Sequence, residues 1–587
     1  MEYLIKVNPL ENPFLSALIA SLPIGFLFWA LAIKRIKGWW ASIGGLLITF
    51  FVALVFYEMP LDKAFASFVF GFTFGLWPLS WIIFSALFLY NLTQTTGDFD
   101  IIRYSLLSIS QDKRILAILI AFCFGAFLEG ASGFGTPVAI TTAILTGLGF
   151  HPVQSASIAL IANTTSVAFG AVGIPIVVGA QVSELDLMTL SKMVGRQLFP
   201  FCFLIPFYIT FLLSGLRRTL EILPFILISG GTFAITTLLV SNLVGPYLPG
   251  ILAAMCSLFV SLIFLKFWQP KEILPAKTLK GCENFEINKG FYKLFRAWLP
   301  FILVSFFIGV WGIKEVKEVL DNLLSFKIFI PKLHREIVDY SGRYKEVYLN
   351  LNLLSSAGTA LFIASILYAL ALRVSFSMFF KIAWQTFKNL KLTFLNIGII
   401  LGFAYMMNFS GMAITLGLAL ASTGYLFPFF SAFIGWLGVF ITGSDTSSNA
   451  LFGKLQEVSA KRLNIEPLLC VATNTTGGVM GKMISPQSIA VATVSSGLSG
   501  REGELFRLTF KHSLFLTTLV GLFSLMQSYW LTFMIPASSM ESSFVRDVQD
   551  EKNFSGYLYL SSTLFLAGIT VFIVRLKEAG SSIDREN

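Results

Sequence analysis

The sequence has few charged residues for its length, and this removes several classes of protein. Of 587 residues, only 13% are Asp, Glu, Lys or Arg, whereas a soluble globular chain has about 25%. Hydrophobic residues make up 56%. This balance excludes a soluble enzyme and a disordered chain as the main interpretation. The net charge of +10 does not indicate a nucleic-acid partner, because the basic residues lie between apolar runs.

The residues of common cofactor and metal sites are also scarce. The five Cys have no paired spacing, and three His in the whole chain argue against a His-built metal or haem site. The sequence has no GxxxxGK[ST] motif, which argues against an ATP-driven pump. We therefore expect no cofactor and no metal. The first residues lack a basic region followed by a small-residue cleavage site, so no removable signal peptide is expected.

Apolar segments long enough to cross a bilayer, about 20 residues each, are abundant. Two further regions, 114–181 and 411–498, are apolar but interrupted by Gly, Ser, Thr, Asn and Pro. We predict an all-α polytopic membrane protein with about 13 spanning helices plus two re-entrant hairpins. The uninterrupted spans are predicted at 14–33, 39–57, 64–92, 197–216, 219–242, 246–268, 291–313, 355–372, 389–409, 512–536 and 557–574.

Basic residues in the short loops predict the orientation, because cytoplasmic loops are enriched in Lys and Arg. Alternate loops hold Lys34, Arg35, Lys37, Arg103, Lys113, Arg114, Arg217, Arg218, Lys271, Arg296 and Arg373. This pattern places the N-terminus outside, and an extra span at 557–574 returns the C-terminus to the cytoplasm. The polar segment 314–352 is then external, although it holds seven basic and six acidic residues.

The pattern N-T-T-x4-G-x4-P occurs twice, at 163–175 and 474–486, with an offset of 311 residues. Arg196 and Arg507 are separated by the same offset. Chance similarity in a Gly- and Thr-rich chain is the alternative. If each copy is one broken span after a re-entrant hairpin, the two copies cross the membrane in opposite directions. Inverted repeats with discontinuous helices are typical of secondary transporters.

The repeat divides the chain into four parts. The first inverted repeat is 1–216, with a hairpin at 114–149 and a broken helix at 153–181. Linking helices and a cytoplasmic loop occupy 217–290. The second repeat is 291–536, with a hairpin at 428–455 and a broken helix at 465–490. An extra helix and tail follow at 537–587.

Four broken stretches offer free backbone groups and short polar side chains at membrane depth: Gly130–Pro137, Asn163–Gly173, Gly443–Asn449 and Asn474–Pro486. Irregular backbone is tolerated there only where protein or a water-filled cavity surrounds it. Helix N-termini facing such a cavity favour an anion, which suits a small hydroxycarboxylate. The alternative is that the small residues merely permit close helix packing. Because the stretches are paired by the repeat, we favour a binding site.

Ionisable residues within these regions are functional hypotheses, because an unpaired charge at this depth is costly. Asp445 is a candidate proton carrier or hydroxyl acceptor, with a helix cap as the alternative. Lys482 is a candidate countercharge to a substrate carboxylate, with a lysine that extends to the interface as the alternative. Arg196 and Arg507 fit boundary anchors or structural ion pairs better than ligands.

An anion importer gains from carrying a cation, because the membrane potential otherwise opposes it. His151, the only His near either region, lies at a loop edge, so a carboxyl group is the remaining proton carrier. Burial favours the neutral form of such a group. We rank Asp445 first, because its polar neighbours can solvate both protonation states, and Glu129 second.

Four segments carry a resemblance to a known family: FLEGASGFGTPVAITTAILTGLGF, LIANTTSVAFGAVGIPI, WLGVFITGSDTSSNALFGKLQ and NTTGGVMGKMISPQSIAVA. They resemble the L-lactate permease family over roughly residues 10–536. The resemblance implies a proton symporter of L-lactate, often also of D-lactate and glycolate, in the bacterial or archaeal plasma membrane. It also implies an elevator-like motion, two re-entrant hairpins and a homodimer. The tail 537–587 and the amino-acid sequence of 314–352 depart from the family.

Carried over by position, the resemblance implies the substrate-binding residues. They are Ser132, Gly133, Thr136, Asn163, Thr164, Thr165, Ser444, Thr446, Ser447, Ser448, Asn449, Asn474, Thr475 and Thr476, and Lys482 joins the predicted set as the countercharge candidate argued above. Asp445 and Glu129 are the proton-coupling candidates. The expected partners are a small monocarboxylate (lactate or glycolate), a proton and the lipid bilayer, with no nucleic acid.

Three other functions compete with this interpretation. The first is a sodium-coupled symporter of di- or tricarboxylates from the same superfamily. The second is a membrane-embedded enzyme, which would need a concentrated catalytic constellation where only isolated carboxylates occur. The third is a channel, against which the paired inverted hairpins argue.

Overall fold

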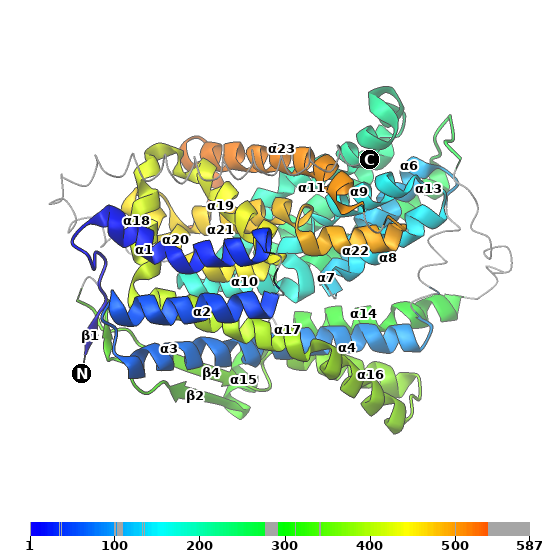
Figure 1. Ribbon diagram of the computed structural model, residues 1–587. Coiled ribbons are helices and arrows are strands. Elements are labelled where there is room, and N and C mark those ends of the chain that lie inside the picture. The colour runs from blue at the N-terminus through cyan, green and yellow to red at the C-terminus, as the bar shows by residue number, and fades with distance from the viewer. Residues whose placement is uncertain are drawn as a thin grey trace.

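The computed structural model describes residues 2–34, 36, 38–98, 101, 110–131, 133, 135–275, 291–311, 313–339, 342–498 and 501–537. Most of these residues are helical, and the long helices run side by side along one direction (Figure 1). The predicted extra span at 557–574 lies outside the described residues.

The helices pack as two bundles. The first bundle has α1 (Pro13–Phe28), α2 (Gly38–Val55), α3 (Leu61–Phe74), α4 (Trp81–Thr95), α14 (Phe291–Trp311), α16 (Ala357–Ala371), α17 (Phe376–Ser410) and α18 (Met412–Leu420). Most of it forms the lower layer of Figure 1. Two π-helical segments, η1 (Trp29–Ile33) and η2 (Gly75–Ser80), continue α1 and α3.

The second bundle contains both predicted repeat cores. Its first half has α6 (Lys113–Ala117), η3 (Ile118–Phe124), α7 (Gly125–Ala131), α8 (Thr136–Gly147), α9 (Pro152–Asn163), η4 (Val167–Phe169), α10 (Gly170–Ser183), α11 (Leu187–Glu221), α12 (Leu223–Leu243) and α13 (Pro249–Phe267). Its second half has η5 (Ala421–Leu426), α19 (Phe427–Thr442), α20 (Asp445–Arg462), α21 (Pro467–Lys482), α22 (Pro486–Ser496), α23 (Glu502–Tyr529) and η6 (Thr532–Met534).

Ten helices in the described part of the chain are long and apolar enough to cross a membrane, or up to 12 if each bent pair is one span. One bent pair is 152–163 with 167–183, at 61°. It occupies the segment predicted as the first broken helix. Two predicted spans are longer in the structure, because α11 and α17 have 35 residues each.

The polar segment after α14, predicted as an external loop, contains secondary structure of its own. It contains α15 (Lys314–Leu323) and the strands β2 (Ser325–Phe329), β3 (Ile337–Val338) and β4 (Tyr348–Asn352). β2 pairs antiparallel with β4, with Ser325 opposite Asn352. The N-terminal strand β1 (Tyr3–Leu4) pairs parallel with β3, so this segment and the N-terminus lie at the same end of the molecule.

The two hairpins enter the second bundle from opposite ends. Hairpin 1 (α6 to α8) starts beside the end of α11, far from β1 in Figure 1. The first broken helix then runs towards the N-terminal end, where Glu184 pairs with Lys345 at 2.7 Å. Hairpin 2 (α19 and α20) starts at that same end, since Lys454 of α20 also pairs with Glu184, at 3.3 Å. The hairpins are therefore inverted relative to each other.

Glycines set the close approach of helices in both bundles. A Cβ on Gly435 of α19 would lie 1.9 Å from the carbonyl oxygen of Asn474 in α21, and one on Gly477 would lie 2.1 Å from that of Ala432. In the first bundle, a Cβ on Gly71 would lie 2.4 Å from the Leu401 oxygen. Small residues let helix backbones approach in this way inside membranes. Close packing therefore accounts for some of the glycines in the broken stretches.

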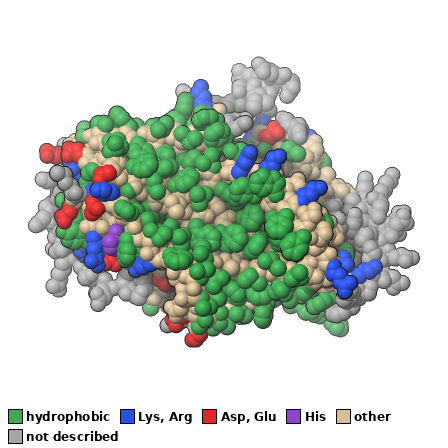
Figure 2. Space-filling model, turned by 90° about the horizontal axis from the view of Figure 1, so that it is seen from below, with side chains coloured by type: hydrophobic (Ala, Val, Ile, Leu, Met, Phe, Trp, Pro, Cys, Tyr) green, Lys and Arg blue, Asp and Glu red, His purple; other side chains and the backbone are tan. Residues whose placement is uncertain are grey.

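Hydrophobic side chains cover most of the face in Figure 2. The first bundle exposes large apolar residues of α3, α14, α16 and α17, among them Phe65, Phe306, Leu370 and Trp384, each more than half exposed. A face of this extent would be unstable in water. The protein is therefore a multi-pass membrane protein.

Candidate functional site

Glu129 lies in the last turn of α7, at the tip of hairpin 1, and is 3% exposed. The tip turns back through Gly133 and Gly135, whose φ angles of 62° and 84° favour glycine. A Cβ on Gly170 would lie 2.9 Å from Oε1 of Glu129, so the carboxyl group rests against the first broken helix. Oε2 has no hydrogen-bond partner among the described residues.

Two predicted residues of this tip lie wholly or partly outside the described part of the chain. Ser132 lies outside the described residues. Thr136 is the first residue of α8, and its side chain is also outside the description.

The first N-T-T sequence lies where α9 ends. The hydroxyls of Thr164 and Thr165 donate to the carbonyls of Ile161 and Ala162, at 2.7 and 3.0 Å, and so complete the end of their own helix. Asn163 is 2% exposed, and its amide lies beside the Glu129 carboxyl group without reaching hydrogen-bond geometry with any described residue. The chain then turns through Ala171, a non-glycine residue with a φ of 43°. This stretch is broken, as the sequence predicts.

Hairpin 2 reverses at Gly443, which has a φ of 71°. Ser444 caps α20 by accepting a hydrogen bond from the backbone N–H of Ser447, at 3.3 Å. Asp445 follows inside the helix, 3% exposed, and neither carboxyl oxygen has a partner in the described residues. The alternative that Asp445 is the helix cap is therefore wrong. Thr446 is half-buried and Ser447 is buried.

The second N-T-T sequence differs from the first, because residues 474–476 lie within the continuous helix α21. The break comes later, at residues 483–485, and Ser485 caps α22. The prediction that this N-T-T sequence is itself unwound is wrong.

A buried amide network engages the side chains of this part of α21. Asn474 donates to Oδ1 of Asn449 at 2.8 Å and accepts from Gln456 at 3.1 Å. Thr475 bonds Asn449, Thr476 donates to Gln197, and Gln197 donates to Gln527. Ser448 donates to the carbonyl of Gly435. The polar atoms of Asn449 and Asn474 are thus engaged within the protein, which joins α11, α20, α21 and α23.

The sequence analysis missed three members of this network: Gln197, Gln456 and Gln527. A signal was present for Gln197 and Gln527, because each is the only amide side chain of a long membrane helix, where it needs a hydrogen-bonding partner. Arg196 bonds Asn242 at 3.1 Å and the carbonyl of Met534 at 2.8 Å, while Arg507 lies exposed on α23.

Lys482 lies near the tips of both hairpins. Its ammonium donates to the carbonyl of Gly443 at 2.8 Å, and the residue is 8% exposed. The carboxyl groups of Glu129 in hairpin 1 and Asp445 in hairpin 2 are near enough to feel its charge, but neither lies within the 4.0 Å of an ion pair. This lysine therefore lies inside the protein, and it is not extended to an interface.

Contacts also link the four broken stretches to one another. The Asp445 carboxyl group rests on α21, since a Cβ on Gly478 would lie 2.4 Å from its Oδ1. Asn449 of hairpin 2 donates to the carbonyl of Pro175 in the first broken helix, at 2.9 Å. Glu129, Asn163, Asp445 and Lys482 thus come from four interrupted segments and form a buried polar junction. Chemically, the junction offers one cation, one amide and two carboxyl groups.

A model of the family described as L-lactate permease matches residues 16–531. The chain is 47% identical to the L-lactate permease of Bacillus subtilis (strain 168), over 89% of this chain and 98% of that protein. It is 44% identical to the glycolate permease GlcA of Escherichia coli (strain K12), over 90% and 98%. The solved structure of the Alcanivorax borkumensis YdaH transporter aligns with a TM-score of 0.41 at 14% identity, over 79% of this chain and 87% of that one.

The matched residues include both hairpins, both N-T-T sequences and all four residues of the buried polar junction. The Bacillus subtilis relative matches over nearly its whole length. The four segments that carry the resemblance also lie within the residues that the family model matches. The chain belongs to the L-lactate permease family.

Proposed function

We propose that the protein is a secondary active transporter that imports L-lactate, and also D-lactate and glycolate, by proton symport across the cell membrane. The observation that carries this proposal is the buried polar junction. Glu129 and Asp445 there have carboxyl oxygens without hydrogen-bond partners among the described residues and lie near the Lys482 charge, and Asn163 lies beside Glu129. Buried polar groups are normally paired, so unpaired ones at a junction of broken helices suit a ligand.

The chemistry of the junction suits a 2-hydroxycarboxylate. The Lys482 ammonium and the Asn163 amide can donate to a carboxylate. A carboxyl oxygen of Glu129 or Asp445 can accept from the 2-hydroxyl group. Relatives named for lactate and for glycolate support this choice, because both molecules are 2-hydroxycarboxylates.

Proton coupling is proposed on Asp445 first and Glu129 second. A carboxylate buried without a partner is costly, and protonation removes that cost. An anion that enters the junction increases the cost, so it favours the protonated form. A co-transported proton also removes the opposition of the membrane potential, about 2.3 kcal/mol per charge per 100 mV.

We also propose that the N-terminus is outside, the C-terminus is cytoplasmic and the protein is a homodimer with an elevator-like motion. The described basic residues of the predicted cytoplasmic loops support the orientation. Lys113, Arg217, Lys271 and Arg296 lie at or beside helix ends remote from β1.

The test is transport by purified protein in proteoliposomes, with proton and sodium gradients imposed separately. The panel contains L-lactate, D-lactate, glycolate and succinate. We expect an inward proton gradient to drive accumulation of the three monocarboxylates but not of succinate, whose second carboxylate would meet Glu129 or Asp445.

Accumulation driven by sodium alone would refute proton symport in favour of the sodium-coupled alternative. Preference for succinate over lactate would refute the substrate assignment. Empty liposomes with the same gradients correct for passive entry of the neutral acids.

A further inference from the structure

The buried polar junction holds one positive charge and two acidic groups, each from a different hairpin. The Lys482 ammonium donates to the Gly443 carbonyl at 2.8 Å, and the carboxyl groups of Glu129 and Asp445 lie near it without forming an ion pair with it. All three side chains are at least nine-tenths buried. A buried charge without a countercharge is costly, so the net charge of these three side chains determines in which states the junction can exclude water.

Counting charges gives two neutral states. The empty junction is neutral when Lys482 faces one carboxylate and the other carboxyl group is protonated. With a lactate anion bound, the junction is neutral when Lys482 faces the substrate and both carboxyl groups are protonated. The two states differ by one lactate and one proton.

We infer that Lys482 exchanges its internal carboxylate for the carboxylate of the substrate, and that the released internal group takes up the transported proton. The inference rests on the proposed function. Lactate binding alone would leave a charge of −1 in the closed junction, and proton binding alone would leave +1. The charge of each ligand compensates the charge of the other, so transport is electroneutral with one proton per lactate.

The geometry assigns the exchanging group to Asp445. Gly443, whose carbonyl holds the Lys482 ammonium, precedes Asp445 by two residues at the same tip. The Asp445 carboxyl group packs on Gly478, four residues before Lys482 and therefore on the same face of α21. Glu129 belongs to the opposite hairpin and packs on Gly170, so it is the group that keeps its proton.

The experiment measures lactate accumulation in proteoliposomes under a pH gradient, with the membrane potential set independently by potassium and valinomycin. The wild type should reach about a tenfold concentration ratio per pH unit, and this ratio should not change with the potential. A ratio that depends on potential would overturn the exchange, even though lactate and protons would still move together. Accumulation that needs sodium would instead overturn the proposed function.

Three variants assign the roles. Asp445→Asn should lose pH-driven accumulation but retain lactate exchange. Its net lactate uptake should rise with an inside-positive potential. The reason is that the empty junction of this variant carries the uncompensated positive charge of Lys482 back to the outside face. Glu129→Gln should transport more slowly but reach the same ratio per pH unit. Lys482→Gln should lose both uptake and exchange. The matched control is Lys511→Gln, an exposed lysine of α23.

Any of three results would overturn the assignment. They are pH-driven accumulation in Asp445→Asn, a lost pH response in Glu129→Gln, and lactate accumulation in Lys482→Gln. Size-exclusion chromatography of each variant establishes that it is folded. The potential dependence of the wild type tests the exchange without any variant.

Discussion

Two asparagines at matching positions of the repeat differ in what surrounds them. Both amide atoms of Asn474 are engaged by Asn449 and Gln456, whereas the amide of Asn163 lies beside Glu129 and reaches hydrogen-bond geometry with no described residue. Counted from the hairpin glycines Gly133 and Gly443, the residues of hairpin 1 that correspond to Asn449 and Gln456 are Ala139 and Thr146. The first copy lacks the two amides, so its asparagine stays available.

Substitution of the two asparagines should therefore have opposite effects. Asn163→Ala should weaken lactate binding by about tenfold to a hundredfold, the equivalent of a lost hydrogen bond of about 1–3 kcal/mol, without lowering the melting temperature. Asn474→Ala should lower the melting temperature, because Asn449 and Gln456 would then be buried without that partner. Lactate titration and thermal unfolding of both variants in detergent make the comparison.

The two variants act as controls for each other, because they remove the same group from equivalent motifs. If Asn163→Ala bound lactate with unchanged affinity, Asn163 would not be a ligand.

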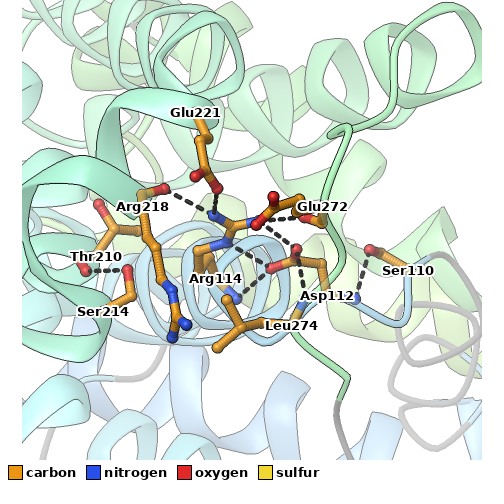
Figure 3. Close-up of polar contacts among 9 residues, drawn as sticks. All are labelled: Ser110, Asp112, Arg114, Thr210, Ser214, Arg218, Glu221, Glu272 and Leu274. Atoms are coloured by element: carbon orange, nitrogen blue, oxygen red, sulfur yellow. Dashed lines mark hydrogen bonds and ion pairs between the residues drawn. The ribbon is translucent and has the colours of Figure 1, made fainter.

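At the scale of elements, Arg114 connects three segments at the end remote from β1 (Figure 3). It lies at the start of hairpin 1 and is fully buried. Its guanidinium donates to Asp112 at 3.1 and 2.7 Å, to Glu221 at 2.8 Å, and to the carbonyls of Arg218 and Glu272 at 2.7 and 2.6 Å. All five N–H groups are thereby satisfied. Hairpin 1 is attached to the end of α11 and to the segment after α13.

Arg114→Met should destabilise the protein by about 3–5 kcal/mol, because it leaves the buried carboxylate of Asp112 without its countercharge. The measurement is the thermal unfolding of the purified variant. Arg217→Met, which removes an exposed arginine from the end of α11, is the matched control and should unfold like the wild type. Equal melting temperatures for all three proteins would show that the network does not stabilise hairpin 1.

The periodic and compositional features of the sequence predicted most of the elements. Apolar runs placed the spans, and glycine-rich interruptions placed both hairpin tips and the first break at Asn163. They could not show that α21 remains helical through Asn474, because the N-T-T sequence is the same in both copies. The strands β2 to β4 were also missed, since their pairing partners are set by the fold rather than by a strong alternating pattern.

The sequence predicted all four residues of the buried polar junction as site candidates but not the contacts that each makes. Lys482 was predicted as a countercharge to substrate alone, and its contact with Gly443 became visible only when hairpin 2 was placed against α21. Arg114 appeared in the sequence only as a basic loop residue. Its buried network depends on chain segments about a hundred residues away.

At the scale of the whole molecule, the segment between α14 and α16 bridges the two bundles at the end that holds the N-terminus. This segment is joined to the first bundle by Lys63, which pairs with Glu336 at 2.6 Å, and to the second by Lys345, which pairs with Glu184 at 2.7 Å. The inverted hairpins meet at Lys482, inside the second bundle. Binding and coupling are therefore proposed within one bundle, and alternating access as its movement relative to the other.

The most direct test of this account is an experimental structure of the protein in lipid nanodiscs with L-lactate at acidic pH. The account predicts lactate at the buried polar junction, with its carboxylate on the Lys482 ammonium and the Asn163 amide, and its hydroxyl on Glu129 or Asp445. Lactate bound elsewhere, for example between the two bundles without contact to Lys482 or either carboxyl group, would contradict it.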